Sequence, residues 1–143
     1  MARVHIDLPA TFPFATEIPV RVTDINYGGH LGNDALLGLI HEARCRFFQH
    51  YGFKETDVAG AGILMTDVVI TYRKEVFHGE VLRFEVGVMD LQRTSCDIVY
   101  RVTRAGEVTA EAKTGIVFFD YQRRKIVRTP PEFAALFPAS ASP

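Results

Sequence analysis

The spacing of apolar residues changes along the chain, and each change predicts a different element. A short alternating run at residues 17–22, Glu-Ile-Pro-Val-Arg-Val, predicts a strand. Pro19 makes this an edge strand or a strand entry, because proline has no N–H to donate to a neighbouring strand. From Asp34 to Tyr51 the apolar residues recur every three or four positions, which predicts one long helix. We expect this helix to be nearly enclosed, since its apolar positions are Leu36, Leu37, Leu39, Ile40, Ala43, Phe47 and Phe48.

The second half of the chain alternates apolar and polar residues with a period of two, which predicts strands. The four alternating runs are residues 63–73, 82–88, 96–103 and 108–118. Turn signals such as Phe77-His78-Gly79 separate them, so the runs form an antiparallel meander. A basic turn at Gln122–Lys125 and a short helical turn at Phe133–Phe137 follow. The whole chain, residues 1–143, is therefore expected to be one α+β domain with a five-stranded antiparallel sheet around one long central helix.

Charge and composition narrow the classes of function. The chain has 16 basic and 17 acidic residues and a net charge of −1, so no overall field attracts nucleic acid or an anionic membrane. The N-terminal residues lack the apolar segment of a signal peptide, and no apolar run is long enough to span a membrane. We therefore expect a cytoplasmic protein. Cys45 and Cys96 are too few for a disulfide framework and are expected to be reduced and buried.

Candidate chemistry is concentrated between the first strand and the long helix. Asp24, His30 and Asn33 lie in a glycine-containing loop, and Glu42 follows on the helix. Glycines expose backbone N–H groups, and the N-terminus of a helix favours negative charge. A carboxylate beside such donors predicts hydrolysis at a carbonyl, with the amides holding the oxyanion and Asn or His orienting water. Spacing alone does not separate this chemistry from three structural alternatives: a turn shaped by Asp24, a helix N-cap at Asn33 or Asp34, and an i,i+4 ion pair of Glu42 with Arg46.

Two other motifs are incomplete in this segment. A dinucleotide-binding glycine motif would need its first glycine at position 27, which is Tyr27, and no parallel strand-helix-strand unit follows. His41-Glu42 begins a zinc-protease motif, but Cys45 stands in place of the second His. His41 and Cys45 have helical spacing for a zinc ion only if two further ligands converge on them.

The segment from Asp24 to Arg44 resembles the hot-dog fold thioesterases, specifically the 4-hydroxybenzoyl-CoA thioesterase-like branch. That branch has an Asp at the end of the first strand, an Asn nine residues later and an E-x-A-R-like segment on the helix; here these are Asp24, Asn33 and Glu42-Ala43-Arg44. His30 lies three residues before Asn33, as in the branch with an H-V-N-N loop, although Gly32 replaces its first Asn. The resemblance implies an acyl-CoA thioesterase with no separate cofactor or metal.

By the same resemblance, Asp24 acts as nucleophile or general base, Asn33 or His30 positions water, and Glu42 is a second carboxylate candidate. The substrate-binding residues that it implies are Tyr27, Gly28, Gly29 and Leu31. Related hydratases have a His five residues after the Asp, whereas His30 is six residues after Asp24, which favours hydrolysis over hydration.

The resemblance also implies a homodimer joined edge to edge through its sheets, or a homotetramer built from such dimers, with acyl-CoA as the small-molecule partner. The cations available for coenzyme A phosphates are Arg93, Arg123, Arg124, Lys125 and Arg128, unless they form only a solvated basic turn. Two alternative functions remain: an acyl-carrier-protein thioesterase, and a non-catalytic module that binds acyl-CoA or acyl-carrier protein.

Overall fold

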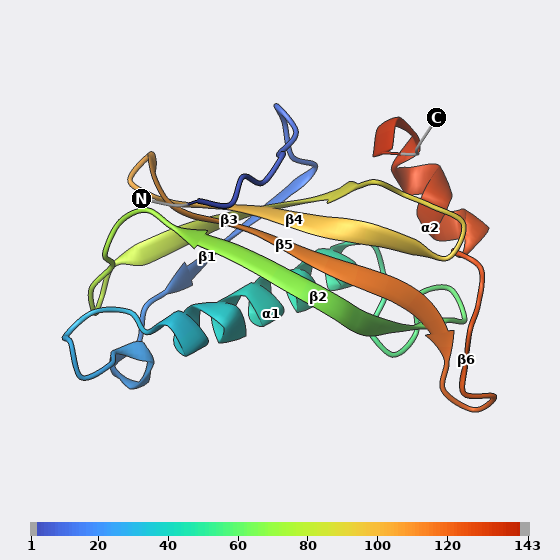
Figure 1. Cartoon of the computed structure of the whole chain (residues 1–143), viewed down its shortest axis with the longest axis horizontal. Coiled ribbons are helices and arrows are strands. Elements are labelled where there is room, and N and C mark those ends of the chain that lie inside the picture. The colour runs from blue at the N-terminus through green and yellow to red at the C-terminus, as the bar shows by residue number, and fades with distance from the viewer. Residues whose placement is uncertain (1–2, 141–143) are drawn as a thin grey trace.

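A curved antiparallel sheet lies over one long helix in the computed structural model, which describes residues 3–140 (Figure 1). The strands are β1 Phe14–Pro19, β2 Gly62–Tyr72, β3 Val81–Met89, β4 Ser95–Arg104, β5 Glu107–Asp120 and β6 Lys125–Ile126. The helices are α1 Asn33–His50 and α2 Pro131–Leu136, with short 3-10 turns η1 Val22–Asp24 and η2 Pro138–Ser140. This is the predicted hot-dog arrangement of one long helix and an antiparallel sheet.

The strands are ordered β1-β3-β4-β5-β2, and β6 pairs with the end of β5. The predicted five strands are present, and β6 is a sixth that the sequence did not predict. It forms because β5 extends past the point where β4 begins at Ser95, opposite Val117, so that Phe119 and Asp120 are free to pair with Ile126 and Lys125. The sheet therefore has two long edges, one at β1 and one at β2.

The first strand lies three residues earlier than the predicted range of 17–22. Pro19 is its last residue, and β1 is an edge strand, as the proline predicted. The strand ends there because the Asp24 carboxylate accepts a hydrogen bond from the Arg21 backbone N–H at 2.9 Å, which folds Val22–Asp24 into the 3-10 turn η1. This turn leads the chain into the loop before α1.

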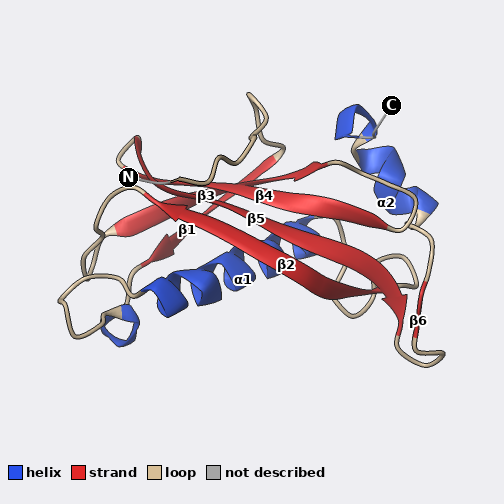
Figure 2. Ribbon diagram, in the orientation of Figure 1, coloured by secondary structure: helices blue, strands red, loops and turns tan. Residues whose placement is uncertain are grey.

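The core lies between α1 and the inner face of the sheet (Figure 2). Phe47 and Phe48 on α1 are fully buried, and Phe48 meets Phe133 of α2, whose ring also contacts Phe118 of β5. The opposite face of α1 is open in the single chain, where the exposed residues include Leu37, Gly38, His41, Glu42 and Cys45. The predictions of a nearly enclosed helix and of a buried Cys45 are therefore wrong for one chain, because the sheet covers only one side of α1.

The two predicted N-cap residues do not cap α1. Gly32 occupies the N-cap position, and no side chain accepts a hydrogen bond from the first turn. Asn33 is instead the first helical residue. No helix between residues 3 and 140 is long and apolar enough to cross a membrane.

Candidate functional site

A cavity of about 230 Å³ lies at the N-terminal end of α1. One wall consists of residues 30–33 and Leu36, which approach and begin the helix. The other walls are residues 72–76, at the end of β2, and Thr109 and Ala110 of β5. Because Tyr72 pairs with Ala110 across the sheet, the end of β2 and the start of β5 close the cavity against the helix.

The first turn of α1 offers hydrogen-bond donors without acceptors. The backbone N–H groups of Leu31 and Gly32 bind the carbonyls of Val76 and Asp24, at 2.7 and 3.0 Å. The next three N–H groups, at residues 33–35, have no acceptor among the described residues. A helix N-terminus carries a partial positive charge, so these donors stabilise an oxygen on which negative charge develops.

The loop before the helix is a tight turn built on Asn26. Its side-chain Oδ1 accepts the N–H of Gly28 at 2.9 Å, and its carbonyl accepts the N–H of Gly29 at 3.0 Å. Gly29 has φ of +83°, a conformation that favours glycine. Tyr27 is fully exposed at the tip of the turn. Of the four predicted substrate-binding residues, only Leu31 lines the cavity, while Tyr27, Gly28 and Gly29 form the outer turn.

Asp24 is buried, with 7% of its surface exposed, and both of its oxygens bind Arg21. Arg21 Nε donates to Oδ2 at 3.2 Å and its NH2 group donates to Oδ1 at 3.1 Å, in addition to the backbone bond. Burial raises the pKa of the Asp24 carboxyl, but the hydrogen bonds from Arg21 outweigh burial and hold this pKa below its ordinary value. Asp24 does not line the cavity; in this conformation it anchors the loop.

His30 and Asn33 are the predicted catalytic residues that do line the cavity. The His30 ring is half-buried, and its Nδ1 lies 3.2 Å from the carbonyl of Leu31. When Nδ1 carries the proton it donates to that carbonyl, which leaves Nε2 as a proton acceptor. Asn33 is exposed, and its carbonyl accepts a bond from the Tyr72 hydroxyl at 3.5 Å.

Glu42 lies away from this group. Its carboxylate accepts a hydrogen bond from Arg46 Nε at 2.8 Å, and Arg46 also binds Thr16 and the carbonyl of Glu17 in β1. Glu42 lies nine positions after Asn33 on the helix, roughly 14 Å along its axis. Within one chain Glu42 therefore forms the i,i+4 ion pair that was its structural alternative.

The sequence did not single out the residues that complete the cavity. They include Tyr72 at the end of β2, Lys74 just after that strand, and Thr109 of β5, all far from the loop in sequence. The one local signal is that the alternating run of residues 63–73 ends at Arg73, where a second cation, Lys74, follows. Spacing gives no information on which strand end meets the helix.

Comparisons with known proteins agree on the family. Residues 20–137 match the thioesterase-like superfamily. Similar solved structures include the PA2801 protein from Pseudomonas aeruginosa, with a TM-score of 0.81, 22% identity and coverage of 89% of this chain and 99% of that one. Slr0204, a 1,4-dihydroxy-2-naphthoyl-CoA thioesterase from Synechocystis, has a TM-score of 0.77 and 18% identity over 86% and 94% of the two chains.

The BH1999 gentisyl-coenzyme A thioesterase has a TM-score of 0.76 and 13% identity over 84% and 98% of the two chains. No curated protein sequence matches this chain at a significant level. Because the family match covers most of the chain, including the loop, α1 and every strand after β1, this protein belongs to the thioesterase-like superfamily and is a thioester hydrolase.

Proposed function

We propose that this protein hydrolyses acyl-CoA thioesters, with the thioester carbonyl at the N-terminal end of α1. The observation that carries the proposal is the set of backbone N–H groups at residues 33–35, which have no acceptor among the described residues. The first of them belongs to Asn33, which lines the same cavity as His30. Such donors bind the oxyanion of a tetrahedral intermediate more strongly than the ground-state carbonyl. Two structurally similar proteins are coenzyme A thioesterases by name, which supports coenzyme A as the carrier.

In the reaction, a water oxygen attacks the thioester carbon and its proton passes to a base. The tetrahedral intermediate then collapses, the C–S bond breaks, and the carboxylic acid and the coenzyme A thiol are released. His30 lines the cavity and is one candidate base; its Nε2 lies beside Gly28 of the outer turn in this conformation, so it would act after a rotation of the ring. Asp24, the base or nucleophile that the family resemblance implies, could serve only after Arg21 moves away, and the Arg21 side chain is 66% exposed and so has room to do so.

We further propose that the active unit is a homodimer joined through β2. This strand forms one edge of the sheet, and Leu64, Val68 and Tyr72 on it are exposed. A long apolar edge that stays unpaired promotes aggregation, so pairing with a second copy is the expected use of this edge. In an antiparallel pair of β2 strands, Gly62 of one copy lies toward Tyr72 of the other.

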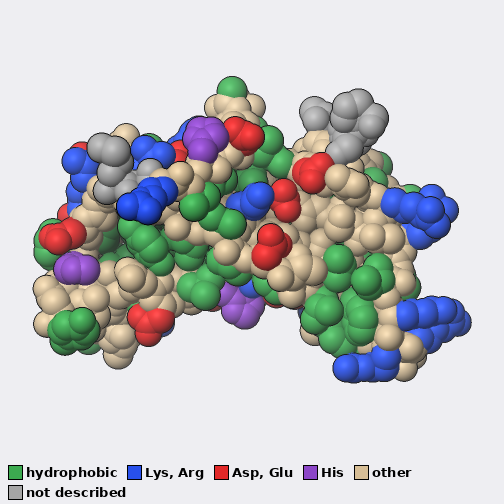
Figure 3. Space-filling view, viewed as in Figure 1, with side chains coloured by type: hydrophobic (Ala, Val, Ile, Leu, Met, Phe, Trp, Pro, Cys, Tyr) green, Lys and Arg blue, Asp and Glu red, His purple; other side chains and the backbone are tan. Residues whose placement is uncertain are grey.

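This pairing supports a role for the basic residues in binding coenzyme A phosphates. Lys and Arg side chains gather at the β6 end of the molecule, opposite the N-terminus of α1 (Figure 3). Four of these side chains line a cleft of about 570 Å³: Arg93, Arg123, Lys125 and Arg128. Gly62 and Ile126 both pair with Phe119, so this cleft lies beside the start of β2. In the dimer, the partner's basic cleft would therefore approach the cavity.

The test is hydrolysis of a panel of aliphatic and aromatic acyl-CoA thioesters by the wild type, Asp24→Asn and His30→Gln. If either side chain is the base, its variant loses roughly 10²-fold or more in kcat. Asp57→Asn is the matched control, because Asp57 also anchors a loop, through the Gly60 N–H, but lies outside the cavity. No turnover of any thioester by the wild type would exclude the proposed function for that panel.

The dimer is tested by light scattering of the wild type and Val68→Glu, which should be a monomer. A mixture of Asp24→Asn with Arg128→Glu then tests whether one site uses both chains. If it does, hybrid dimers regain activity that neither parent shows. Activity in a monomeric Val68→Glu variant would contradict the composite site while leaving the hydrolase assignment intact.

A further inference from the structure

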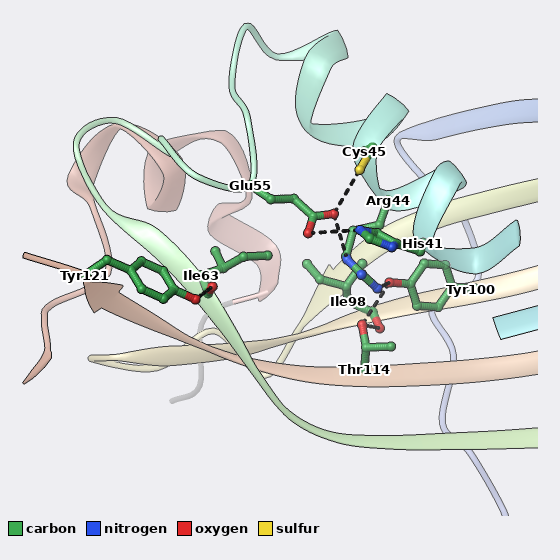
Figure 4. A network of polar contacts seen from close by, with 9 residues as sticks. All are labelled: His41, Arg44, Cys45, Glu55, Ile63, Ile98, Tyr100, Thr114 and Tyr121. Atoms are coloured by element: carbon green, nitrogen blue, oxygen red, sulfur yellow. Dashed lines mark hydrogen bonds and ion pairs between the residues drawn. The ribbon is translucent and has the colours of Figure 1, made fainter. Parts of the chain in front are cut away.

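A second polar cluster lies on the exposed side of α1, in the half of the helix away from the cavity (Figure 4). His41 and Cys45 are four residues apart and so lie on the same face of the helix. Glu55, in the loop between α1 and β2, reaches back to both. His41 Nε2 is 3.4 Å from Glu55 Oε1, and Cys45 Sγ is 3.1 Å from Glu55 Oε2.

The position of Glu55 is fixed from beneath by a buried cation. Arg44, only 5% exposed, donates from Nε to Glu55 Oε2 at 3.1 Å and from NH1 to the Tyr100 hydroxyl at 3.3 Å. That hydroxyl lies 2.8 Å from Thr114 Oγ1, which binds the carbonyl of Ile98 in the sheet. Figure 4 shows this chain of contacts running from the loop into the core. Arg44 holds one carboxylate oxygen, which leaves Oε1 facing His41.

We propose that His41, Cys45 and Glu55 bind a transition-metal cation of the zinc class. Their ligand atoms all lie within 4.8 Å of one another. Zinc bonds to N, O and S are about 2.0 to 2.3 Å long, so the ligand atoms of one tetrahedral ion lie roughly 3.3 to 3.8 Å apart, a spacing that small side-chain rotations reach. An imidazole, a thiolate and a carboxylate favour zinc, cobalt or nickel over magnesium or calcium, which take oxygen ligands.

The surroundings suit a three-ligand site with an open fourth position. His41 and Cys45 are exposed, so the ion has a path from solvent. Cys45 and Glu55 also border a cavity of about 410 Å³ lined by Gln49 and Lys54, where water or a small anion can take the remaining position. On binding, the thiol proton leaves to solvent and the metal-sulfur bond replaces the contact of Cys45 with Glu55. Arg44 acts as a positioning residue, because it orients a ligand carboxylate without touching the ion.

The experiment is a cobalt titration of the full-length, untagged, reduced protein, since Co²⁺ in place of Zn²⁺ gives visible and charge-transfer absorption. We expect one Co²⁺ per chain, a thiolate charge-transfer band and tetrahedral d–d bands that added Zn²⁺ displaces. Cys45→Ser should abolish the charge-transfer band. His41→Gln and Glu55→Gln should each weaken affinity by more than roughly 100-fold, because even a partner outside the ligand shell accounts for about 10 to 100-fold.

The matched controls are the other cysteine and another histidine of α1. Cys96→Ala tests a thiol that is buried in the sheet. His50→Gln tests an exposed imidazole on the same helix, about two and a half turns after His41. Both variants should keep the cobalt spectrum. Protection of Cys45 from alkylation by Zn²⁺ gives a second readout, which His41→Gln should remove. A cobalt spectrum that survives Cys45→Ser, or no band with excess Co²⁺, would overturn the proposal. Neither result depends on thioester hydrolysis.

Discussion

The two halves of α1 differ in whether their polar groups are hydrogen-bonded. At the N-terminal end, a glycine occupies the N-cap and three backbone donors have no acceptor among the described residues. In the second half, Arg44 and its neighbours Glu55 and Tyr100 form a continuous set of hydrogen bonds with the core. Unpaired donors at a cavity remain free for a ligand, whereas paired groups stabilise the fold. The contrast is consistent with the proposed oxyanion site at the first end and with structural anchoring by Arg44 at the second.

The strongest way to break this contrast is to remove the buried cation. Arg44→Met should lower the free energy of unfolding by about 3 kcal/mol, because loss of one partner leaves a largely buried carboxylate without its ion pair. Breaking a buried ion pair costs about 3 to 5 kcal/mol, and the lower value applies because the Glu55 side chain is 21% exposed. Urea denaturation measures the change. The cavity lies elsewhere on the helix, so the folded variant should keep its thioesterase activity.

Arg46→Met is the matched control two residues along the same helix. Arg46 pairs with Glu42 on the surface, where an exposed i,i+4 pair contributes only about 0.5 kcal/mol. It also donates to Thr16 and the Glu17 carbonyl, which adds about 1 kcal/mol, so its loss should still be smaller than that of Arg44. If both variants lose the same free energy of unfolding, the buried Arg44 stabilises the fold no more than the surface Arg46 does. A folded Arg44→Met variant without activity would show that the two halves are coupled.

The next largest effect is expected from capping the open end of the helix. In Gly32→Ser, the new hydroxyl can accept from the N–H groups of residue 34 or 35, which stabilises the helix by a few tenths of a kcal/mol. In the proposed reaction the same bond occupies a donor to the oxyanion, and loss of one such donor lowers kcat by about 100-fold. In Gly32→Ser the melting temperature, measured by calorimetry, should therefore rise slightly while kcat falls.

Gly32→Ala separates capping from crowding. A Cβ at this position lies 2.8 Å from Asp34 Oδ1, the far end of a flexible side chain, so both variants require the same small shift. Alanine supplies no acceptor and should keep most of kcat. If alanine and serine lower kcat equally, space rather than the free donors limits the reaction, and the oxyanion role of the helix end is wrong.

Much of this contrast was readable in the sequence, but not all of it. Apolar periodicity predicted α1 and four long strands, because burial on one face leaves a repeating pattern. The pair His41 and Cys45 was visible from helical spacing, whereas Glu55 was not, since it reaches them from an irregular loop. The open N-cap was predicted wrongly because Asn33 and Asp34 are good capping residues, and backbone geometry placed Gly32 there instead. The cavity walls depend on which strand ends meet α1, which local pattern does not encode.

The smallest expected effect tests whether Asp24 acts as the catalytic base or only anchors the loop before α1. Arg21→Ala removes the side-chain donors that hold the pKa of Asp24 below its ordinary value, so that pKa should rise. If Asp24 is the catalytic base, the acid limb of the kcat/KM profile moves to higher pH in this variant. If Asp24 only anchors the loop, the limb does not move.

The pH dependence of the unfolding free energy gives a second measurement on the Arg21–Asp24 pair. A carboxylate whose pKa is lowered on folding stabilises the protein above its unfolded pKa of about 3.9 and loses that contribution as pH falls through the folded pKa. The difference in unfolding free energy between wild type and Arg21→Ala should therefore be constant near pH 6 and shrink below about pH 4. Arg101→Ala is the control, because Arg101 pairs with Glu85 across β3 and β4, and neither residue lines the cavity. A shifted acid limb together with this loss of stability would assign Asp24 both roles, whereas the stability change alone would leave His30 as the candidate base.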